Sequence, residues 1–322
     1  MVFTIGEFNT AFSKDIKETF HNQSMEAEMN STYAKLYDVS DTNEYTASYT
    51  STEGVDLPTY FDEGETLGDT KLGKGYKTTY SSREFGKFIG ITKQARLKLG
   101  DNSEKIAVYA EKQKKSMLVA MKTFLEKEMA GLMDYANATS SSYKILAPDL
   151  QPIAAAAHVR NSTGATFDND LGTSAISIAH ASAVETYAGA FTDSIGTPMP
   201  LTFNTIFVKK GGAASKQAKS VYASKNTQGQ YTVTTITDMN IYEGMVTVVE
   251  TPWMASGNDY LYVASTSDLG VENPLFCEFI ERPTVGETFT ENKNLTWETP
   301  VTASFKFGLK NLPFNLLYGK IA

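Results

Sequence analysis

The stretch 103–137, SEKIAVYAEKQKKSMLVAMKTFLEKEMAGLMDYAN, decides how the rest of the chain is interpreted. Large apolar residues recur in it every three or four positions, which is the period of one helix face. Ser103 is a good N-cap before Glu104 and Lys105, and no proline interrupts the run. At 1.5 Å per residue, we expect one helix about 50 Å long, with the charged run 111–115 on its solvated side. Its apolar stripe consists of Ile106, Ala110, Met117, Met121, Phe124, Leu132 and Met133, widened by Val108, Leu118, Leu125 and Met129.

Residues 41–95, before this helix, predict a long two-stranded hairpin. Aromatic residues and Ala alternate with Thr and Ser over 45–50, and a second alternating run begins at Tyr76 and continues through Thr92. Between the two runs lies a polar tip that is rich in glycine and acidic residues. The hairpin has few apolar residues to hold it against a core, so we expect its partner surface on another chain.

The acidic tip of this hairpin is a candidate contact surface. Its carboxylates do not have the fixed alternate spacing of an EF-hand calcium loop. Two interpretations remain: a solvated charged tip, or a tip that meets basic groups on a neighbouring copy. On the second interpretation, the contact residues of the hairpin are Tyr60, Asp62, Glu63, Glu65, Lys71 and Lys74.

Residues 1–40 predict an amino-terminal arm. Phe8, Phe12, Ile16 and Phe20 recur every four residues among charged residues, which places four large apolar groups on one stripe of a helix. Such a stripe packs either on its own core or on a neighbouring subunit, and spacing alone does not decide between them. On the second alternative, Phe8, Phe12 and Phe20 are contacts between subunits.

After the long helix, the chain has the pattern of a mixed α+β body. Residues 140–171 are rich in Ala, Ser, Asn and Asp and predict loops, and helices are expected near 174–191 and 212–223. No role is assigned to the tail 309–322. Strands are expected at 205–208, 231–236, 245–249, 260–264, 275–280 and 301–307.

The histidines and the cysteine give no pattern of a catalytic or metal site. His21, His158 and His180 have no metal-ligand spacing, and the chain has no G-x-S-x-G nucleophile motif. The single cysteine, Cys277, cannot form an intramolecular disulfide or a cysteine zinc site, and we expect it to be buried in a strand. We therefore expect no catalytic residue, metal or cofactor, and a chain that is not an enzyme.

Charge and hydropathy bear on two further classes of partner, DNA and the membrane. With 29 basic and 37 acidic residues the net charge is −8, so the average field does not attract DNA, although a local DNA-facing surface is compatible with it. The first residues have no signal-peptide pattern, and no apolar run approaches the roughly 20 residues that span a bilayer. We expect a soluble chain without a membrane partner.

The order of these parts resembles the major capsid proteins of tailed bacteriophages, whose fold is the Hong Kong 97 (HK97) type. Local stretches are most similar to Mu-like major head subunits: residues 6–12, 76–80, 196–200 and 279–283. The stretch 305–308 is similar to the last strand of that family, but this chain continues beyond it.

The resemblance implies a division into five parts. These are an N-terminal arm over 1–40, an E-loop β-hairpin over 41–95, a peripheral domain over 96–170 with a spine helix at 103–137, an axial domain over 171–250, and a return to the peripheral sheet over 251–322. Lys71, Lys74 and Lys77 near the hairpin tip leave a Lys–Asn crosslink between copies open, as in some relatives.

The resemblance also implies a function. Copies would self-assemble, as pentamers and hexamers, into the icosahedral capsid of a tailed phage, built in the host bacterial cytoplasm and enclosing double-stranded DNA. Expected partners are other copies, the DNA by weak non-specific contact, a portal and a separate scaffolding protein, since about 40 residues before the hairpin leave no room for a fused scaffold. A decoration protein is compatible with this. Two alternatives stay open: an encapsulin-like nanocompartment shell protein, and a soluble α+β enzyme or binding module.

Overall fold

The computed structural model divides the chain into two compact units, each built from separate segments. Within the described residues, the first unit draws on Met1–Ala47, Tyr80–Glu128 and Cys277–Phe307, and the second on Ser48–Thr79, Met129–Phe276 and Gly308–Ala322. The structure describes residues 31–55, 72–98, 100, 103–134, 146–193, 197–199, 201–224, 240–254, 256–265, 273–287, 289–291 and 296–322.

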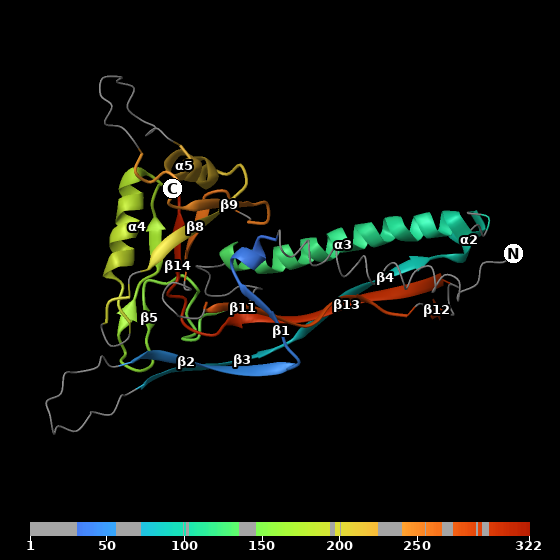
Figure 1. Ribbon diagram of the computed structural model, residues 1–322, viewed down its shortest axis with the longest axis horizontal. Helices are drawn as coiled ribbons and strands as arrows, with labels where there is room; N and C mark the ends of the chain where they lie inside the picture. Colours follow the sequence, from blue (N-terminus) through green and yellow to red (C-terminus); the bar gives the residue numbers. More distant parts are fainter. Residues whose placement is uncertain are drawn as a thin grey trace, which may run out of the picture. The chain divides into compact units, whose positions relative to one another are not determined.

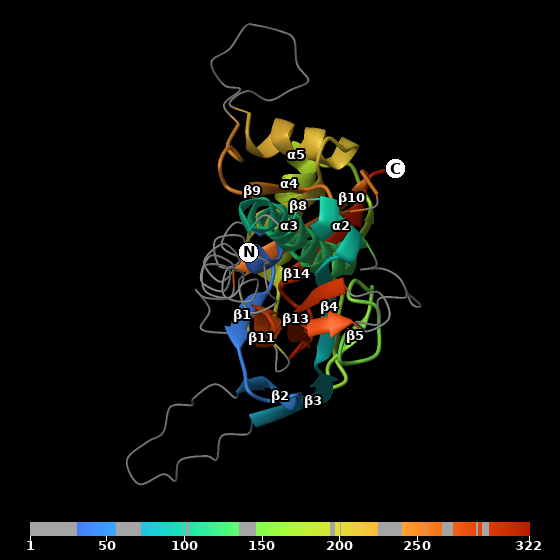
Figure 2. The same cartoon turned by 90° about the vertical axis from the view of Figure 1, so that its right-hand side faces the viewer.

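The first unit is a sheet covered on one face by helices. Its strands run in the order β1 (Asp38–Asp41), β11 (Leu275–Val285), β13 (Thr296–Leu309), β12 (Phe289–Glu291), and β4 (Arg83–Ile91) pairs with β13. Helices α2 (Lys93–Lys98) and α3 (Ser103–Asp134) lie on one side of β4 and β13 in both views (Figures 1 and 2). Their shared core contains Ile89, Ile91, Ile106, Met117, Met121, Val285, Trp297 and Val301.

Helix α3 confirms the predicted long helix over 103–134; the last three predicted residues lie outside the described part. Ile106, Met117 and Met121 of its predicted stripe are buried. Among the stripe residues whose side chains the structure describes, two are exposed: Val108 by 53% and Phe124 by 39%. Val108 is exposed because it lies about 200° around the helix from Ile106. Phe124 lies at the edge of the packed face, where its ring stacks on Phe85.

The second unit contains a five-stranded sheet with helices packed on it. The strand order is β7 (Asp170–Thr173), β14 (Leu316–Lys320), β10 (Asp259–Ser265), β8 (Thr202–Lys209), β9 (Thr247–Thr251). β8 and β9 are parallel, so a crossover must join them, and α5 (Ala213–Tyr222) lies in it. α4 (Ile178–Ala190) and α5 lie beside this sheet (Figure 1). Buried residues of both helices and of β8, β10 and β14 form one core.

Two predicted elements are corrected by the structure. The run 76–92 was expected to be one strand, but it is two: β3 (Leu72–Ser81) pairs with β2 (Thr46–Val55), and β4 pairs with β13. The break occurs at the buried Ser82, whose N–H donates to Tyr45 O and whose Oγ lies 2.8 Å from Ser304 Oγ. The helix expected from 174 begins only at Ile178, because Ser177 caps it by accepting a hydrogen bond from His180 N.

The tail 309–322, to which no role was assigned, completes the second core. β14 runs between β7 and β10, and Leu316, Leu317 and Tyr318 are buried. Gly319 faces the ring of the fully buried Tyr260 so closely that an added Cβ would lie within 2.6 Å of ring atoms. The stretch predicted as a strand at 231–236 lies outside the described residues.

Candidate interaction surfaces

The hairpin of β2 and β3 is held together largely by polar groups. Ser48 Oγ lies 2.8 Å from Thr79 Oγ1 across the two strands, and Ser51 Oγ donates to Tyr76 O at 3.3 Å. Gly75 faces Ser51 so closely that a Cβ on Gly75 would lie 2.8 Å from Ser51 O. The two strands therefore approach each other closely where the hairpin leaves the described part of the chain.

The base of this hairpin rests on the short hairpin of β5 (His158–Val159) and β6 (Thr166–Phe167), which we call the seat. Tyr76 Oη donates to Val159 O at 3.0 Å. Asn161 Nδ2 donates to Gly75 O at 3.1 Å and to Lys74 O at 3.3 Å. Three hydrogen bonds thus fix one strand of the long hairpin against the seat.

Aromatic and cationic groups fix the other strand. The rings of Tyr49 and Phe276 lie 4.8 Å apart, and Lys310 Nζ lies 5.0 Å from the Tyr49 centroid and 5.2 Å from the Phe276 centroid. The first strand, β3, has a further contact outside the seat, because Thr78 Oγ1 donates to Leu309 O at 3.4 Å. The expectation that the hairpin lacks a hold on its own chain is therefore wrong for its described base.

The seat is itself anchored by a buried contact between a histidine and an aspartate. His158 Nδ1 lies 2.9 Å from Asp149 Oδ2, and its Nε2 lies 3.1 Å from Ile153 O. Both of these oxygen atoms accept hydrogen bonds, so the buried ring lies between two acceptors. Burial alone would raise the pKa of Asp149, but hydrogen bonds from His158, Gln151 N and Val159 N, together with electrostatic attraction to His158, hold that pKa below its usual value. His158 also stacks on Phe167 at 5.1 Å.

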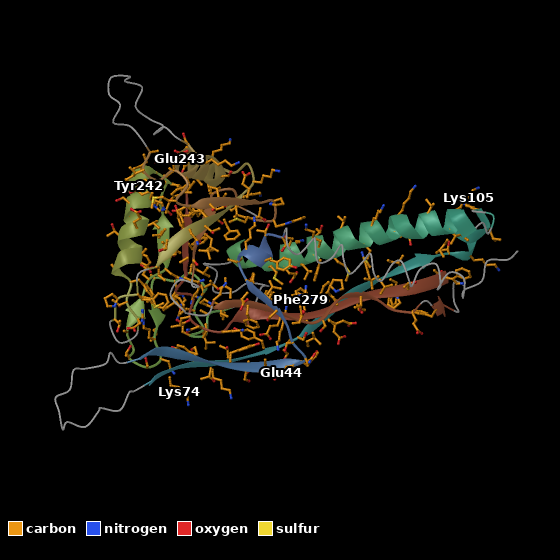
Figure 3. The ribbon with its side chains drawn as sticks, viewed as in Figure 1. Glu44, Lys74, Lys105, Tyr242, Glu243 and Phe279 are labelled. Carbon is orange, nitrogen blue, oxygen red and sulfur yellow. The ribbon has the colours of Figure 1, made fainter. Side chains whose placement is uncertain are left out.

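Of the predicted contact residues, the structure describes one. Lys74, labelled in Figure 3, is exposed. Its backbone carbonyl accepts a hydrogen bond from Asn161 of the seat. The sequence analysis did not predict Tyr76 and Asn161 as anchors of the hairpin, although a tyrosine in a polar strand is a weak signal of docking. The other predicted contacts lie outside the described residues: Phe8, Phe12, Phe20, Tyr60, Asp62, Glu63, Glu65 and Lys71.

An exposed aromatic pair lies on the first unit. Phe88 is 59% exposed and Phe289 is 44% exposed, and their rings meet edge to face at 5.8 Å. Phe88 pairs with Pro300 across β4 and β13, one position away from the buried Ile89. Because neighbouring strand residues point to opposite faces, the Phe88 side chain points away from α3. The sequence pattern alone did not single out either residue.

Within the described residues, Cys277 and the two histidines His158 and His180 are buried in packed parts of the fold. Cys277 is fully buried in β11, as predicted. No group of three or more metal-binding side chains occurs in the part of the chain that the structure describes. None of the helices in that part combines the length and the apolar character needed to cross a membrane.

His180 predicts a pH dependence of stability. Its Nδ1 lies 3.0 Å from Ser174 Oγ, its buried Nε2 has no hydrogen-bond partner among the described residues, and burial lowers its pKa. Below the ordinary value of 6.5, the unfolded chain gains a proton that the folded chain resists. We expect the free energy of unfolding to fall as the pH drops below about 6.5, by up to about 1.4 kcal/mol per pH unit. Urea unfolding of the wild type and of His180→Gln measures this, and an equal fall in both would contradict the assignment.

Comparison with known proteins identifies the fold. No protein-family model matches the sequence, and no curated protein matches it. The capsid structure of cyanophage P-SCSP1u superimposes with a TM-score of 0.53 at 10% identity, covering 91% of this chain and 88% of that one. The capsid of an empty GTA particle gives 0.54 at 11% identity (91% and 90%), and a structure from Mycobacterium phage Patience gives 0.52 at 9% (97% and 88%). The chain therefore has the predicted α+β fold of the HK97 type, whereas the likeness to Mu-like subunits stays a prediction.

Proposed function

We propose that this chain is the major capsid protein of a tailed bacteriophage, a structural subunit whose copies close into an icosahedral shell around double-stranded DNA. The observation that carries the proposal is the match of the fold to phage and GTA capsid chains over about nine-tenths of both chains. The division into N-arm, E-loop, peripheral and axial domains follows from the same likeness and is part of the proposal.

The described contacts give the hairpin a role in this assembly. A two-stranded arm gains little stability by itself, and its edges present unpaired backbone groups that can bind a further strand. The seat holds the base of this arm through Tyr76, Gly75 and Lys74, so its direction is fixed by its own chain. We infer that the hairpin of β2 and β3 is oriented before it meets a second copy. This orientation lowers the conformational entropy that the hairpin loses on binding.

We assign the contacts between copies to the tip of the hairpin and to the amino-terminal arm over 1–40. In this proposal Tyr60, Asp62, Glu63, Glu65, Lys71 and Lys74 touch a neighbouring subunit, and Phe8, Phe12 and Phe20 bury apolar area on one at about 25 cal/mol per Å². Each contact is modest, but every subunit makes several and closure of the shell multiplies them. Any scaffold is a separate protein, and a portal and assembly in the bacterial cytoplasm complete the proposal.

Electron microscopy of the purified chain tests the proposal directly. We expect closed shells, and replacing Asp62, Glu63 and Glu65 together by the uncharged Asn, Gln and Gln should lower the yield of shells about tenfold, an assembly penalty of about 1.4 kcal/mol. Glu84, Glu185 and Glu243 are exposed elsewhere, and their replacement by Gln is the matched control. A small, monodisperse oligomer without shells would support a binding module or an enzyme instead. Shells that copurify with an enzyme and without DNA would support an encapsulin-like compartment.

A further inference from the structure

The second unit has an apolar cleft beside helix α4. Its volume is about 340 Å³, and residues of α4, of the start of β8 and of the turn 240–246 line it. Several of these side chains are buried: Val184 is 4% exposed, Leu201 is 4% exposed and Phe203 is 7% exposed. Clefts of about 300–1,000 Å³ with mostly apolar walls are typical binding sites.

The turn beside this cleft holds two apolar side chains in solvent. Ile241 is 74% exposed, and Met245, which lines the cleft, is 50% exposed. The backbone of the turn is fixed to the end of α5, because Asn240 Nδ2 donates to two carbonyl oxygens there and Gly244 N donates to Tyr222 O at 2.9 Å. The folded turn therefore presents these two side chains to solvent in a defined position next to the cleft.

The charge around the cleft is negative. Of the described residues that line it, Glu185 is the only one that is charged at neutral pH, and it is exposed. Glu243 is also exposed and follows Tyr242, which lines the cleft; Figure 3 labels both residues. Helix α4 and the turn contain no Lys or Arg. Two carboxylates thus lie on the elements that form the cleft, without a basic residue on either element.

The lysines of α5 are directed to other positions. Helix α5 contributes Tyr222 to the cleft. Lys219 Nζ lies 2.8 Å from Glu250 Oε2, so its charge is already paired. Lys216 lies about 120° around the helix from Tyr222. A partner that fills the cleft therefore gains by carrying a positive charge beside its apolar groups.

We propose that this cleft binds an amphipathic, basic helix of a separate protein. Apolar side chains at positions i, i+4 and i+7 of that helix fill the cleft and cover Met245 and Ile241. Its Lys or Arg side chains face Glu185 and Glu243. The lengths agree, since α4 lines the cleft from 181 to 189, about 12 Å, and the three anchors extend over about 10.5 Å. This inference goes beyond the proposed function, because the partner is not another copy.

Helix α2 of a second copy is the alternative occupant. Leu97 is 61% exposed there, between the exposed Lys93 and Lys98. However, α2 has six residues, about 9 Å, and Leu97 is its only leucine. One leucine fills a single position of a cleft whose α4 wall offers space for three. A longer helix with several anchors therefore fits the cleft better than α2 does.

Fluorescence anisotropy with a labelled model peptide and the unassembled chain tests the inference. The probe is a helical peptide of about 18 residues, with Leu at each i, i+4 and i+7 position and Lys at the others. In one matched peptide every Lys is replaced by Glu, and in the other every Leu is replaced by Ser. At about 150 mM salt we expect each matched peptide to bind at least about tenfold more weakly, because one loses the attraction to the carboxylates and the other loses the apolar contacts.

Two variants locate the binding at the cleft. Gly189 lines it and has open space where a Cβ would be placed, so Gly189→Leu fills part of the cleft and should weaken binding of the Leu/Lys peptide at least about tenfold. Ala183→Leu is the matched control, because Ala183 is exposed on the same helix outside the cleft. Glu185→Gln should weaken binding about threefold, whereas Glu84→Gln on the first unit should not change it.

The outcomes separate this inference from the proposed function. Equal binding of the Leu/Lys and Leu/Glu peptides would overturn the inference, and so would equal losses in Gly189→Leu and Ala183→Leu. A lower yield of shells from Gly189→Leu, without any peptide binding by the wild type, would assign the cleft to a second copy and contradict the inference. Normal shells without peptide binding would also contradict it and leave the capsid function intact. Peptide binding in the cleft of a chain that forms no shells would support the inference and count against the capsid function.

Discussion

Replacing Lys306 by alanine is expected to lower the free energy of unfolding by about 3–5 kcal/mol. Lys306 lies in β13 and is 1% exposed. Its Nζ lies 3.1 Å from Glu278 Oε2 and donates to Glu44 O at 2.9 Å. Figure 3 labels Glu44, whose carbonyl lies between β1 and β2 in the chain. Truncation would leave the Glu278 carboxylate in the interior without the positive charge beside it, which costs far more than the lost contact itself.

A second variant separates the ion pair from the packing around it. Changing Lys306→Met and Glu278→Leu together removes both charges while keeping much of the volume, and we expect it to recover most of the lost stability. Urea unfolding is measured for the unassembled wild type, for Lys306→Met alone, for Glu278→Leu alone and for the double variant. These four free energies of unfolding give the coupling energy of the pair. A loss of less than about 1 kcal/mol in Lys306→Ala, or a double variant as unstable as the single ones, would contradict this assignment.

The sequence predicted the elements whose pattern is local. Helix α3 follows from a regular apolar period that no proline interrupts, and both features are visible within one stretch. The burial of Lys306 is not visible in that way. It depends on Glu278, which lies on β11, and no local rule pairs these strands in the correct register. The same reason explains the break at Ser82, which is fixed by Ser304 in another strand.

At the candidate site, the contacts of the hairpin could likewise not be predicted from the local sequence pattern. Its alternating polar and aromatic residues predicted two strands, and β2 and β3 confirm them. Its hold on the seat depends on Tyr76 with Val159 and on Asn161 with Gly75, pairs that are 83 and 86 positions apart. Such contacts follow from tertiary arrangement, whereas a polar strand by itself indicates only that little apolar area is available for burial. The expectation that the hairpin finds its partner surface on another chain is therefore wrong for its described base.

Because the hairpin is oriented by its own chain, a single methyl group at Gly75 should disturb assembly more than it disturbs the fold. A Cβ at Gly75 would lie 2.1 Å from Ser51 Oγ and 2.8 Å from Ser51 O, and the backbone oxygen cannot rotate away as a side chain can. We expect Gly75→Ala to destabilise the hairpin by about 1–3 kcal/mol, since relief requires the strands to move apart and to lose the bond from Asn161 to Gly75 O. In the proposed capsid this would lower the yield of shells by at least about tenfold.

Gly189→Ala is the matched control, because Gly189 in α4 has open space where a Cβ would be placed. Hydrogen exchange of residues 46–55 and 72–81 reports on the hairpin without any reference to assembly, and electron microscopy reports on shells. Faster exchange confined to the hairpin, together with few shells, would mean that the hairpin must be bound to the seat in its native orientation before copies can assemble. Unchanged exchange and a normal yield of shells from Gly75→Ala would show that the close approach of Gly75 and Ser51 has no part in directing the arm, and the orienting role of the seat would have to be abandoned.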